Sequence, residues 1–273
     1  MRELERDLPA IPESATLDAP AAPGNLVIVG HGRAGRSIAA AADAAGIKVS
    51  VLGRADEVPR LDAASAMVLL CVPDAAITGA CERVATEVPP GTAVGHSSGA
   101  TPLAALAAAT ARECPTYSLH PLQTIPEPDT SLADAPCAVS GSDDAVLGRA
   151  HALASALGMR PFDVPEERRA AYHAAASMAS NFLITLEESA AELLGAAGVE
   201  NPREVLAPIV LRTAANWADR GSEALTGPIA RGDEHVVDAH LNALAERMPE
   251  LAPLYEALAE CTRAIARREA DAR

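Results

Sequence analysis

Lysine is almost missing from this chain of 273 residues. Lys48 is the single lysine and every other basic residue is an arginine, so a mechanism that needs an active-site lysine must use Lys48 or fail. Aromatic residues are also scarce, at 2%, and 37 acidic residues against 22 basic ones give a formal net charge of −15. Nucleic-acid binding depends on basic grooves and stacking rings. We therefore expect no nucleic-acid partner and a small polar molecule as the substrate.

Long apolar runs and paired cysteines are missing too. The longest clean apolar run covers residues 67–72, against the ~18 to 20 residues of a transmembrane helix, so we expect no membrane contact. Residues 1–24 mix charges with proline and alanine and contain no signal-peptide core, which we interpret as a flexible tail of a cytoplasmic protein. The five cysteines lack C-x-x-C spacing, so we predict reduced thiols and no metal site.

Residues 25–165 alternate short β-rich runs with alanine-rich helical stretches. The expected strands cover residues 26–29, 48–52, 67–72, 92–95, 116–119, 137–139 and 160–164. Such alternation is typical of right-handed βαβ crossovers. We predict the α/β class, with a doubly wound parallel sheet of the Rossmann type.

The pattern changes after Pro165. Helices are expected over residues 166–197, 202–219, 234–247 and 252–272, and no strand-like alternation occurs there. We therefore predict an all-helical C-terminal domain over residues 166–273, which contacts the substrate and forms a homodimer through its alanine-rich helices.

A G-x-G-x-x-G motif follows the first expected strand and opens the first expected helix. It consists of Gly30, His31, Gly32, Arg33, Ala34 and Gly35. In this context the first glycine makes a tight turn, the second lets the backbone approach a pyrophosphate, and the third lets helix and strand pack closely. We predict a dinucleotide-binding loop, with the phosphates at the N-terminus of the helix.

The end of the second expected strand indicates which dinucleotide binds. Gly53 and Arg54 stand where an NAD enzyme usually carries a carboxylate, and the next carboxylate is Asp56. A guanidinium can bind a 2′-phosphate or stack on adenine. We therefore predict NADP(H) as the cofactor. Arg33 and Arg36 either assist Arg54 or are solvated surface charges.

Three further loops follow expected strands, where the ligands of open α/β sheets bind. Val72 and Pro73 are expected beside the nicotinamide, and Ser97, Ser98 and Gln123 are expected to contact cofactor or substrate. His120 is the candidate proton donor or acceptor, because histidine transfers protons near neutral pH. Two alternatives stay open: His120 is a loop histidine satisfied by backbone, and His96 belongs to the end of its strand.

The helical region contains two polar groups of interest. His173, Ser177 and Asn181 follow one another at intervals of four residues and are expected on one face of a helix. Arg231 either holds a substrate carboxylate, oriented by Asp233, or belongs to a simple turn between helices.

Six ordered motifs carry a resemblance to a known family. They are G-H-G-R-A-G-R-S, L-L-C-V-P-D, H-S-S-G-A, S-L-H-P-L-Q-T, Y-H-A-A-A-S-M-A-S-N and L-T-G-P-I-A-R-G-D. Together they resemble the family that pairs a Rossmann-like NAD(P)-binding domain with the C-terminal domain of unknown function 2520. The resemblance implies the 6-phosphogluconate dehydrogenase-like group, with pyrroline-5-carboxylate reductase, prephenate dehydrogenase and ketopantoate reductase. These relatives bind substrate between two domains and often dimerise through the helical one.

The departures from these relatives matter for the mechanism. β-Hydroxyacid dehydrogenases and ketopantoate reductases use a K-x-x-x-N pair, of which this chain matches Asn181 but has Ser177 at the lysine position. Prephenate dehydrogenases place a serine after one strand and His-Pro after the next, as Ser98 (or Ser97) and His120-Pro121 do here. The resemblance thus favours His120 over a lysine as the catalytic group.

We therefore predict an NADP-dependent oxidoreductase that acts on a small, anionic keto or imino compound. His120 would move the proton with Ser98, Asn181 and His173, while Ser97, Gln123, Ser177, Arg231 and Asp233 would bind substrate. Two alternatives remain: a ketopantoate reductase-like enzyme without the lysine, and a non-catalytic sensor of NADP(H).

Overall fold

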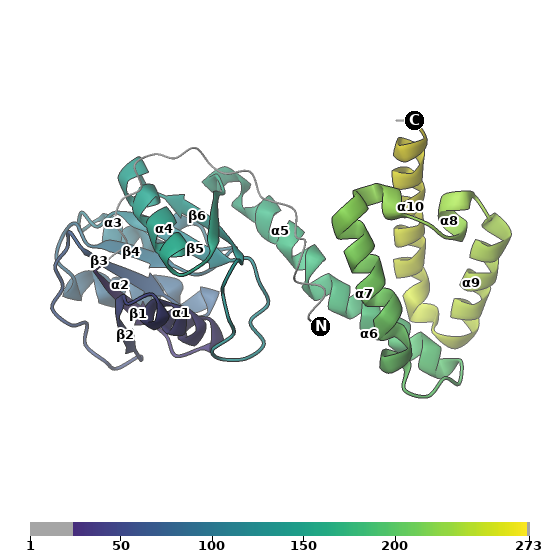
Figure 1. The fold of residues 1–273 in the computed structure, drawn as a ribbon, viewed down its shortest axis with the longest axis horizontal. Helices are drawn as coiled ribbons and strands as arrows, with labels where there is room; N and C mark the ends of the chain where they lie inside the picture. Colours follow the sequence, from purple (N-terminus) through teal and green to yellow (C-terminus); the bar gives the residue numbers. More distant parts are fainter. Residues whose placement is uncertain (1–23, 272–273) are drawn as a thin grey trace. The chain divides into compact units, whose positions relative to one another are not determined.

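A computed structural model describes residues 24–271 of the chain. The tail expected over residues 1–24 falls almost wholly outside the described residues. Within them the chain forms two compact units, residues 24–180 and 181–271 (Figure 1). Each unit is described below by itself.

The first unit is built on a seven-stranded, mostly parallel sheet. Its strands are β1 (Asn25–Val29), β2 (Lys48–Leu52), β3 (Ala66–Leu70), β4 (Ala93–His96), β5 (Thr116–Pro121), β6 (Pro136–Gly141) and β7 (Arg160–Asp163). They lie in the order β2-β1-β3-β4-β5-β6-β7, and only the β5–β6 pair is antiparallel. The predicted α/β class and Rossmann-type sheet are confirmed.

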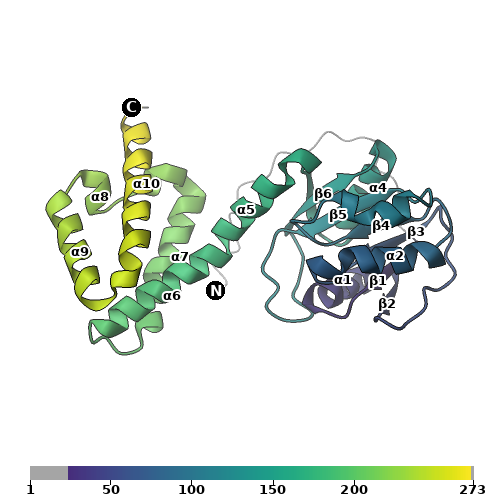
Figure 2. The ribbon, with the colours of Figure 1, turned by 180° about the vertical axis from the view of Figure 1, so that it is seen from behind.

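Helices cover both faces of this sheet (Figure 2). They are α1 (Arg33–Ala44), α2 (Ile77–Glu87), α3 (Ala107–Thr110) and α4 (Asp144–Ala156), with short 3-10 helices η1 (Asp74–Ala76), η2 (Leu103–Leu106) and η3 (Glu166–Arg168). Leu26 and Ile28 of β1 pack in one core with α1 and α4, whereas Val27 and Val29 pack in a second core with α2 and α3. Because successive side chains point to opposite faces, a strand between two cores must be apolar throughout.

The strand order places a topological switch point between β1 and β3. From β1 the chain crosses to β2 on one side and then returns to β3 on the other. The loops that follow β1 and β3 therefore leave the carboxyl ends of these strands in opposite directions, and ligands of such sheets bind between them. Two backbone bonds hold this edge of the sheet: Gly30 N donates to Leu52 O at 2.8 Å, and Cys71 N donates to Val29 O at 2.8 Å.

The helical region begins differently from the prediction. The single helix expected over residues 166–197 is instead η3, α5 (Arg169–Ala179) and α6 (Asn181–Ala196), with a break at Ser180. Ser180 has φ −125° and ψ −74°, outside the helical region, and its hydroxyl donates to Ala176 O at 2.7 Å. The first compact unit extends to Ser180 rather than ending at Pro165, because Arg169 of α5 is buried against the sheet.

The second unit, residues 181–271, is entirely helical, as predicted. It contains α6, α7 (Pro202–Arg220), η4 (Gly221–Ala224), α8 (Pro228–Arg231), α9 (Glu234–Arg247), η5 (Pro249–Leu251) and α10 (Ala252–Asp271). Its fully buried apolar residues are few and mostly small: Ala191, Val237, Leu244 and Ala259. Among the described helices, none is both long and apolar enough to cross a membrane.

Candidate functional site

Two glycines of the motif after β1 are required by the fold itself. Gly30 has φ +127°, and a Cβ there would lie 2.2 Å from the carbonyl oxygen of Cys71. A Cβ on Gly35 would lie 2.3 Å from the carbonyl oxygen of Gly30. Contacts this short do not occur between real atoms, so only glycine lets β1, β3 and α1 approach one another as they do.

Gly32 is not required in this way. A Cβ built on Gly32 would meet no atom within 4 Å, and its φ of −68° suits any residue. Gly32 is also the N-cap of α1, with no side-chain cap and no acidic residue in the first turn. An uncapped helix N-terminus offers unpaired N–H groups and a positive dipole to an anion. The space and the donors at Gly32 therefore fit a pyrophosphate.

The end of β2 carries a positive and a negative group together. Arg54 is exposed, and its side chain has no hydrogen bond or ion pair with any residue that the structure describes. Asp56 folds back so that its Oδ2 accepts a hydrogen bond from Gly53 N at 2.7 Å. The ring of His31 lies over the same glycine, since a Cβ on Gly53 would be 2.9 Å from His31 Nε2. Asp56 thus brings a carboxylate to the end of β2, where we expected none.

Arg33 and Arg36 both contact the loop that precedes β6. Arg33 Nη1 donates to Pro126 O at 3.2 Å, and Arg36 lies 3.5 Å from the carboxylate of Asp129. Both side chains are largely exposed. These contacts hold the loop, while the predicted part of Arg33 in cofactor binding stays a prediction.

His120 lies at the carboxyl end of β5 and is hydrogen bonded to Tyr172 of α5. His120 Nδ1 and the Tyr172 hydroxyl are 2.6 Å apart, and the two rings meet edge to face at 84°. The ring of His173 lies 6.2 Å from that of His120. Gly99 is needed beside them, because a Cβ there would be 2.8 Å from His120 Cε1. His120 is therefore satisfied by a side chain and not by backbone.

Burial controls the protonation of this pair. Burial, followed by the neighbouring His173 and Arg169, lowers the pKa of His120 to about 4, and Asp74 opposes this shift. Burial also raises the pKa of Tyr172 above its ordinary value. At neutral pH the imidazole is thus neutral and the phenol keeps its proton. A phenol that holds its proton donates it to Nδ1, which leaves the imidazole proton on Nε2.

The serines after β4 are largely used by their own loop. Ser98 Oγ donates to Thr101 Oγ1 at 3.0 Å and accepts from Thr101 N at 2.9 Å. Ser97 Oγ donates to Leu70 O at 3.4 Å. To contact cofactor or substrate as predicted, these hydroxyls must therefore break the hydrogen bonds that shape the loop or form a second hydrogen bond beside them.

His96 lies inside the sheet, at the end of β4. Its ring is fully buried, and neither ring nitrogen has a hydrogen-bond partner among the described residues. Burial, with Arg169 nearby, lowers the pKa of His96 to about 4. His96 thus belongs to the strand end, which was one of its two interpretations.

Val72, Pro73 and Gln123 lie in the two remaining loops for which contacts were predicted. Val72 and Pro73 follow β3 directly beside the glycine motif, and Val72 Cγ1 would lie 3.4 Å from a Cβ on Gly30. Gln123 Nε2 donates to Ser131 O at 2.8 Å, so this amide ties down the loop that also contacts Arg33 and Arg36.

The common helix face expected for His173, Ser177 and Asn181 does not exist. His173 and Ser177 lie on α5, but Asn181 begins α6 after the break at Ser180. The four-residue spacing holds only within one continuous helix. Asn181 also belongs to the second compact unit, whereas His120 and His173 lie in the first.

Arg231 and Asp233 lie together in the second unit. Arg231 Nε and Nη2 each lie 2.9 Å from Asp233 Oδ2. Gly227 and Gly232, with φ of +103° and +75°, shape the turns on either side of α8. Arg231 also lines a cavity of about 390 Å³ whose other walls include Thr226 and Glu269. The carboxylate of Asp233 thus orients the guanidinium at the edge of this cavity.

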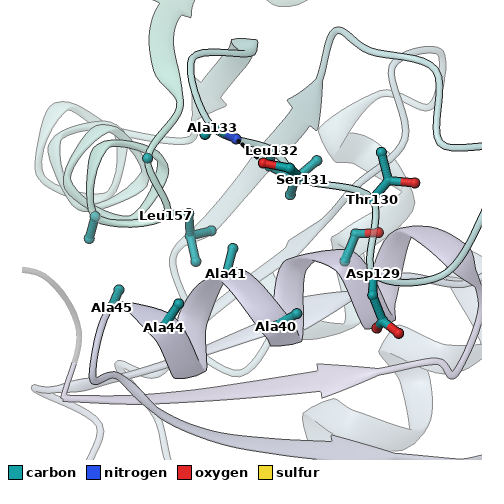
Figure 3. A pocket seen from close by; sticks show the side chains of 13 residues that line it. Ala40, Ala41, Ala44, Ala45, Asp129, Thr130, Ser131, Leu132, Ala133 and Leu157 are labelled. Carbon is teal, nitrogen blue, oxygen red and sulfur yellow. Dashed lines mark hydrogen bonds between the residues drawn. The ribbon is translucent and has the colours of Figure 1, made fainter.

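A second cavity, also of about 390 Å³, lies beside α1 in the first unit. Figure 3 shows its floor of Ala40, Ala41, Ala44 and Ala45 beneath the segment from Asp129 to Ala133. None of the predicted site residues lines it. Between residues 24 and 271 no group of three or more His, Cys, Asp or Glu side chains is placed to hold a metal ion.

Tyr172 and Arg169 were not expected at this site. Tyr172 is one of only three tyrosines and directly precedes His173, which was a usable signal. Arg169 carries no sequence signal beyond its place three residues before Tyr172.

Comparisons with known proteins agree with this architecture. The family model of a Rossmann-like domain matches residues 54–121, and the model named Domain of unknown function (DUF2520) matches residues 135–262. No curated protein matches the chain.

Several solved structures share the fold. One, described as an NADP oxidoreductase from Bacteroides fragilis, has a TM-score of 0.73 and 23% identity, covering 89% of this chain and 98% of its own. A reductive aminase from Aspergillus terreus has a TM-score of 0.58 and 17% identity, covering 89% and 97%. A pyrroline carboxylate reductase from Plasmodium falciparum has a TM-score of 0.56 and 12% identity, covering 89% and 99%. At these identities the likeness shows a common fold, and the two family models match a Rossmann-like region and a DUF2520 region of the chain.

Proposed function

We propose that this protein is an NADP-dependent oxidoreductase that reduces a small, anionic imino or keto compound. The observation that carries the proposal is the 2.6 Å hydrogen bond between His120 and Tyr172 at the carboxyl edge of the sheet. Strands β3 and β4 separate β5 from β1, so at about 4.8 Å per strand the pair lies roughly 14 Å along that edge from the glycine motif. An extended dinucleotide and a small substrate together can bridge such a distance.

The residues around the glycine motif fit NADP(H). The amide groups at the N-terminus of α1 would hold the pyrophosphate over Gly32, and the unpaired guanidinium of Arg54 would hold the 2′-phosphate. Val72, Pro73 and the Ser98 loop would border the nicotinamide. Proteins of the same fold have been crystallised with NADPH and NADP, which supports this cofactor. When bound, NADPH supplies the hydride.

The chain's own residues would supply or hold the proton. Reduction of C=O or C=N adds a hydride to carbon and leaves a proton on oxygen or nitrogen. Because the pKa of His120 is lowered to about 4, the charged imidazolium is scarce at neutral pH. An iminium substrate arrives already protonated, so the neutral pair need not supply a proton, and the Tyr172 oxygen would accept a hydrogen bond from the iminium N–H. This favours an imino compound over a keto compound.

Two further polar side chains of α5 complete the proposal. His173 and Ser177 would be additional contacts of the substrate. Ser97 and Gln123 would act mainly by shaping their loops, since their polar groups are already bonded.

We further propose a homodimer formed by the second unit. Phe182, Ile184, Ile209 and Trp217 of α6 and α7 are each more than half exposed, although large apolar patches are uncommon on monomers. The few buried residues of this unit give it little core of its own, which a second copy packed on α6 and α7 would enlarge. We propose the cytoplasm as its location.

The test is NADPH oxidation with a panel of cyclic imines and keto acids that includes ketopantoate. His120→Gln should abolish turnover and Tyr172→Phe should lower it at least tenfold, with NADPH affinity unchanged. His151→Gln is the matched control, since His151 pairs with Asp163 in the same unit and is hydrogen bonded to neither His120 nor Tyr172. Full turnover by His120→Gln would refute the assignment. Turnover of ketopantoate alone would favour the ketopantoate reductase alternative, and NADPH binding without turnover would favour a sensor.

A further inference from the structure

Arg169, in the first turn of α5, is a buried arginine bound to several segments of the first unit. It is 3% exposed. Its Nη2 donates to Ser118 Oγ at 2.6 Å and to Ser140 Oγ at 2.9 Å, and its Nη1 donates to Ser98 O at 3.4 Å. Its Nε donates to Glu166 Oε1 at 2.8 Å. A buried guanidinium is tolerated only when it is paired and hydrogen bonded, so this network must form whenever α5 docks on the sheet.

The two serines and His120 form a regular pattern on the sheet. Ser118 of β5 lies directly opposite Ser140 of β6 in the antiparallel pair. His120 follows Ser118 by two residues, so both side chains point to the same face of the sheet. Arg169 therefore binds β5 and β6 two residues before the position where Tyr172 binds β5.

The helix repeats this spacing. Tyr172 follows Arg169 by three residues and lies on the same face of α5. Three helical residues rise about 4.5 Å and two strand residues about 6.8 Å, a difference that the long arginine and tyrosine side chains can absorb. If α5 slid by one turn, Tyr172 would move about 5.4 Å and its hydroxyl would no longer reach His120 Nδ1.

We propose that Arg169 is a positioning residue, which fixes the register of α5 on β5 and β6 and so keeps the Tyr172 hydroxyl on Nδ1 of His120. This inference rests on the function proposed above for the His120–Tyr172 pair. It assigns no contact with the substrate to Arg169, whose polar atoms are all turned into the fold.

Arg169 also influences His120 through its charge. The charged and titratable groups that face His120 are Tyr172, His173 and Arg169 from α5, and Asp74 from η1. After burial and His173, the positive charge of Arg169 is the third cause that lowers the pKa of His120. A substitution of Arg169 should therefore shift the pKa of His120. A substitution of a structural residue elsewhere should leave that pKa unchanged.

The experiment is a ¹⁵N NMR titration of the histidines in the full chain without ligand. Wild-type His120 should be the Nε2–H tautomer and remain neutral down to a pH of about 4. In Arg169→Met the midpoint should rise above about 5, because the charge is lost and water reaches the ring. Arg169→Lys and Ser118→Ala keep the charge but weaken the anchor, so they should mix the two tautomers with a smaller rise.

Arg149→Lys provides the matched control. Arg149 also points inward, from α4, and its Nη2 donates to Ala66 O at 2.7 Å. This variant should lower stability without altering the His120 signals. Should Arg169→Met not fold, Arg169→Lys and Ser118→Ala decide the matter.

Folded Arg169→Lys and Ser118→Ala proteins with a wild-type tautomer and titration of His120 would overturn the inference. The titration needs no substrate, so its failure is separate from that of the proposed reaction, which His120→Gln tests. Where both hold, Arg169→Lys should lower kcat at least fivefold while the KM for NADPH stays constant.

Discussion

A methyl group added at Gly32 should leave the fold intact and weaken NADPH binding, whereas one added at Gly35 should destabilise the fold. The two glycines belong to one motif but meet different surroundings. A Cβ on Gly32 would have no neighbour within 4 Å, and a Cβ on Gly35 would lie 2.3 Å from Gly30 O and 3.2 Å from Cys71 Cβ. The comparison therefore separates the glycine needed by a ligand from the glycine needed by the fold.

The stability changes can be worked out from these contacts. In Gly35→Ala, helix α1 must move away from β1, and overpacking of this kind costs about 1–3 kcal/mol. At about 2–4 °C per kcal/mol for a unit of this size, the midpoint of thermal unfolding should fall by about 2–12 °C. In Gly32→Ala the loss of a good N-cap costs about 0.5 kcal/mol, which a less flexible unfolded chain offsets by about 0.4–1 kcal/mol. Its midpoint should stay within about 2 °C of wild type.

NADPH affinity should fall in Gly32→Ala, the variant that keeps its stability. A methyl group at Gly32 would keep the pyrophosphate from the amides of α1, and the loss of charge-assisted hydrogen bonds worth about 1.5–3 kcal/mol weakens binding about 10- to 100-fold. Circular dichroism would give the unfolding midpoints, and calorimetric titration with NADPH would give the affinities. Wild-type NADPH affinity in Gly32→Ala would show that the phosphates do not lie on this loop.

Arg54→Ala should weaken the binding of NADPH at least tenfold and leave the binding of NADH nearly unchanged, whereas Asp56→Asn should strengthen the binding of NADPH. An unchanged ratio of NADPH affinity to NADH affinity in Arg54→Ala would refute the assignment of Arg54 to the 2′-phosphate. Because the pKa values of His96 and His120 are lowered to about 4, the unfolded chain binds more protons below pH 6.5, and each histidine should cost up to about 3 kcal/mol of stability as the pH falls from 6.5 to 4. Denaturant unfolding at several pH values would show this loss, and His120→Gln should reduce it by about half. Light scattering should give a dimer that Trp217→Glu dissociates; a wild-type monomer would reject the proposed interface.

The fold could be predicted because its signals are local. All seven strands were expected, since most are short apolar or alternating runs, and their ends differ from the prediction by at most two residues. The break at Ser180 could not be predicted in this way. No glycine or proline lies between residues 169 and 194, and the alanine-rich sequence is compatible with one continuous helix.

The candidate site was predicted in part for the same reason. The glycine motif and His120 follow strands directly, so chain order alone placed them at the carboxyl edge. Tyr172 reaches His120 across 52 positions of sequence, and it does so because Arg169 binds two serines on different strands. Asp56 likewise returns to Gly53 through a turn that residue types did not reveal. Contacts of this kind depend on tertiary packing and leave no periodic pattern.

The near absence of lysine acquires a structural meaning from this arrangement. Lys48 is the first residue of β2, and β2 runs parallel to β1, so Lys48 lies at the amino edge of the sheet. His120 lies near the carboxyl end of β5, and a five-residue strand spans about 16 Å, so the single lysine cannot reach the pair. No ammonium group is then at hand to protonate a carbonyl oxygen, and the neutral His120–Tyr172 pair is a weak acid. A substrate that brings its own proton, as an iminium does, removes that difficulty, and this is why cyclic imines head the panel of compounds to be tested.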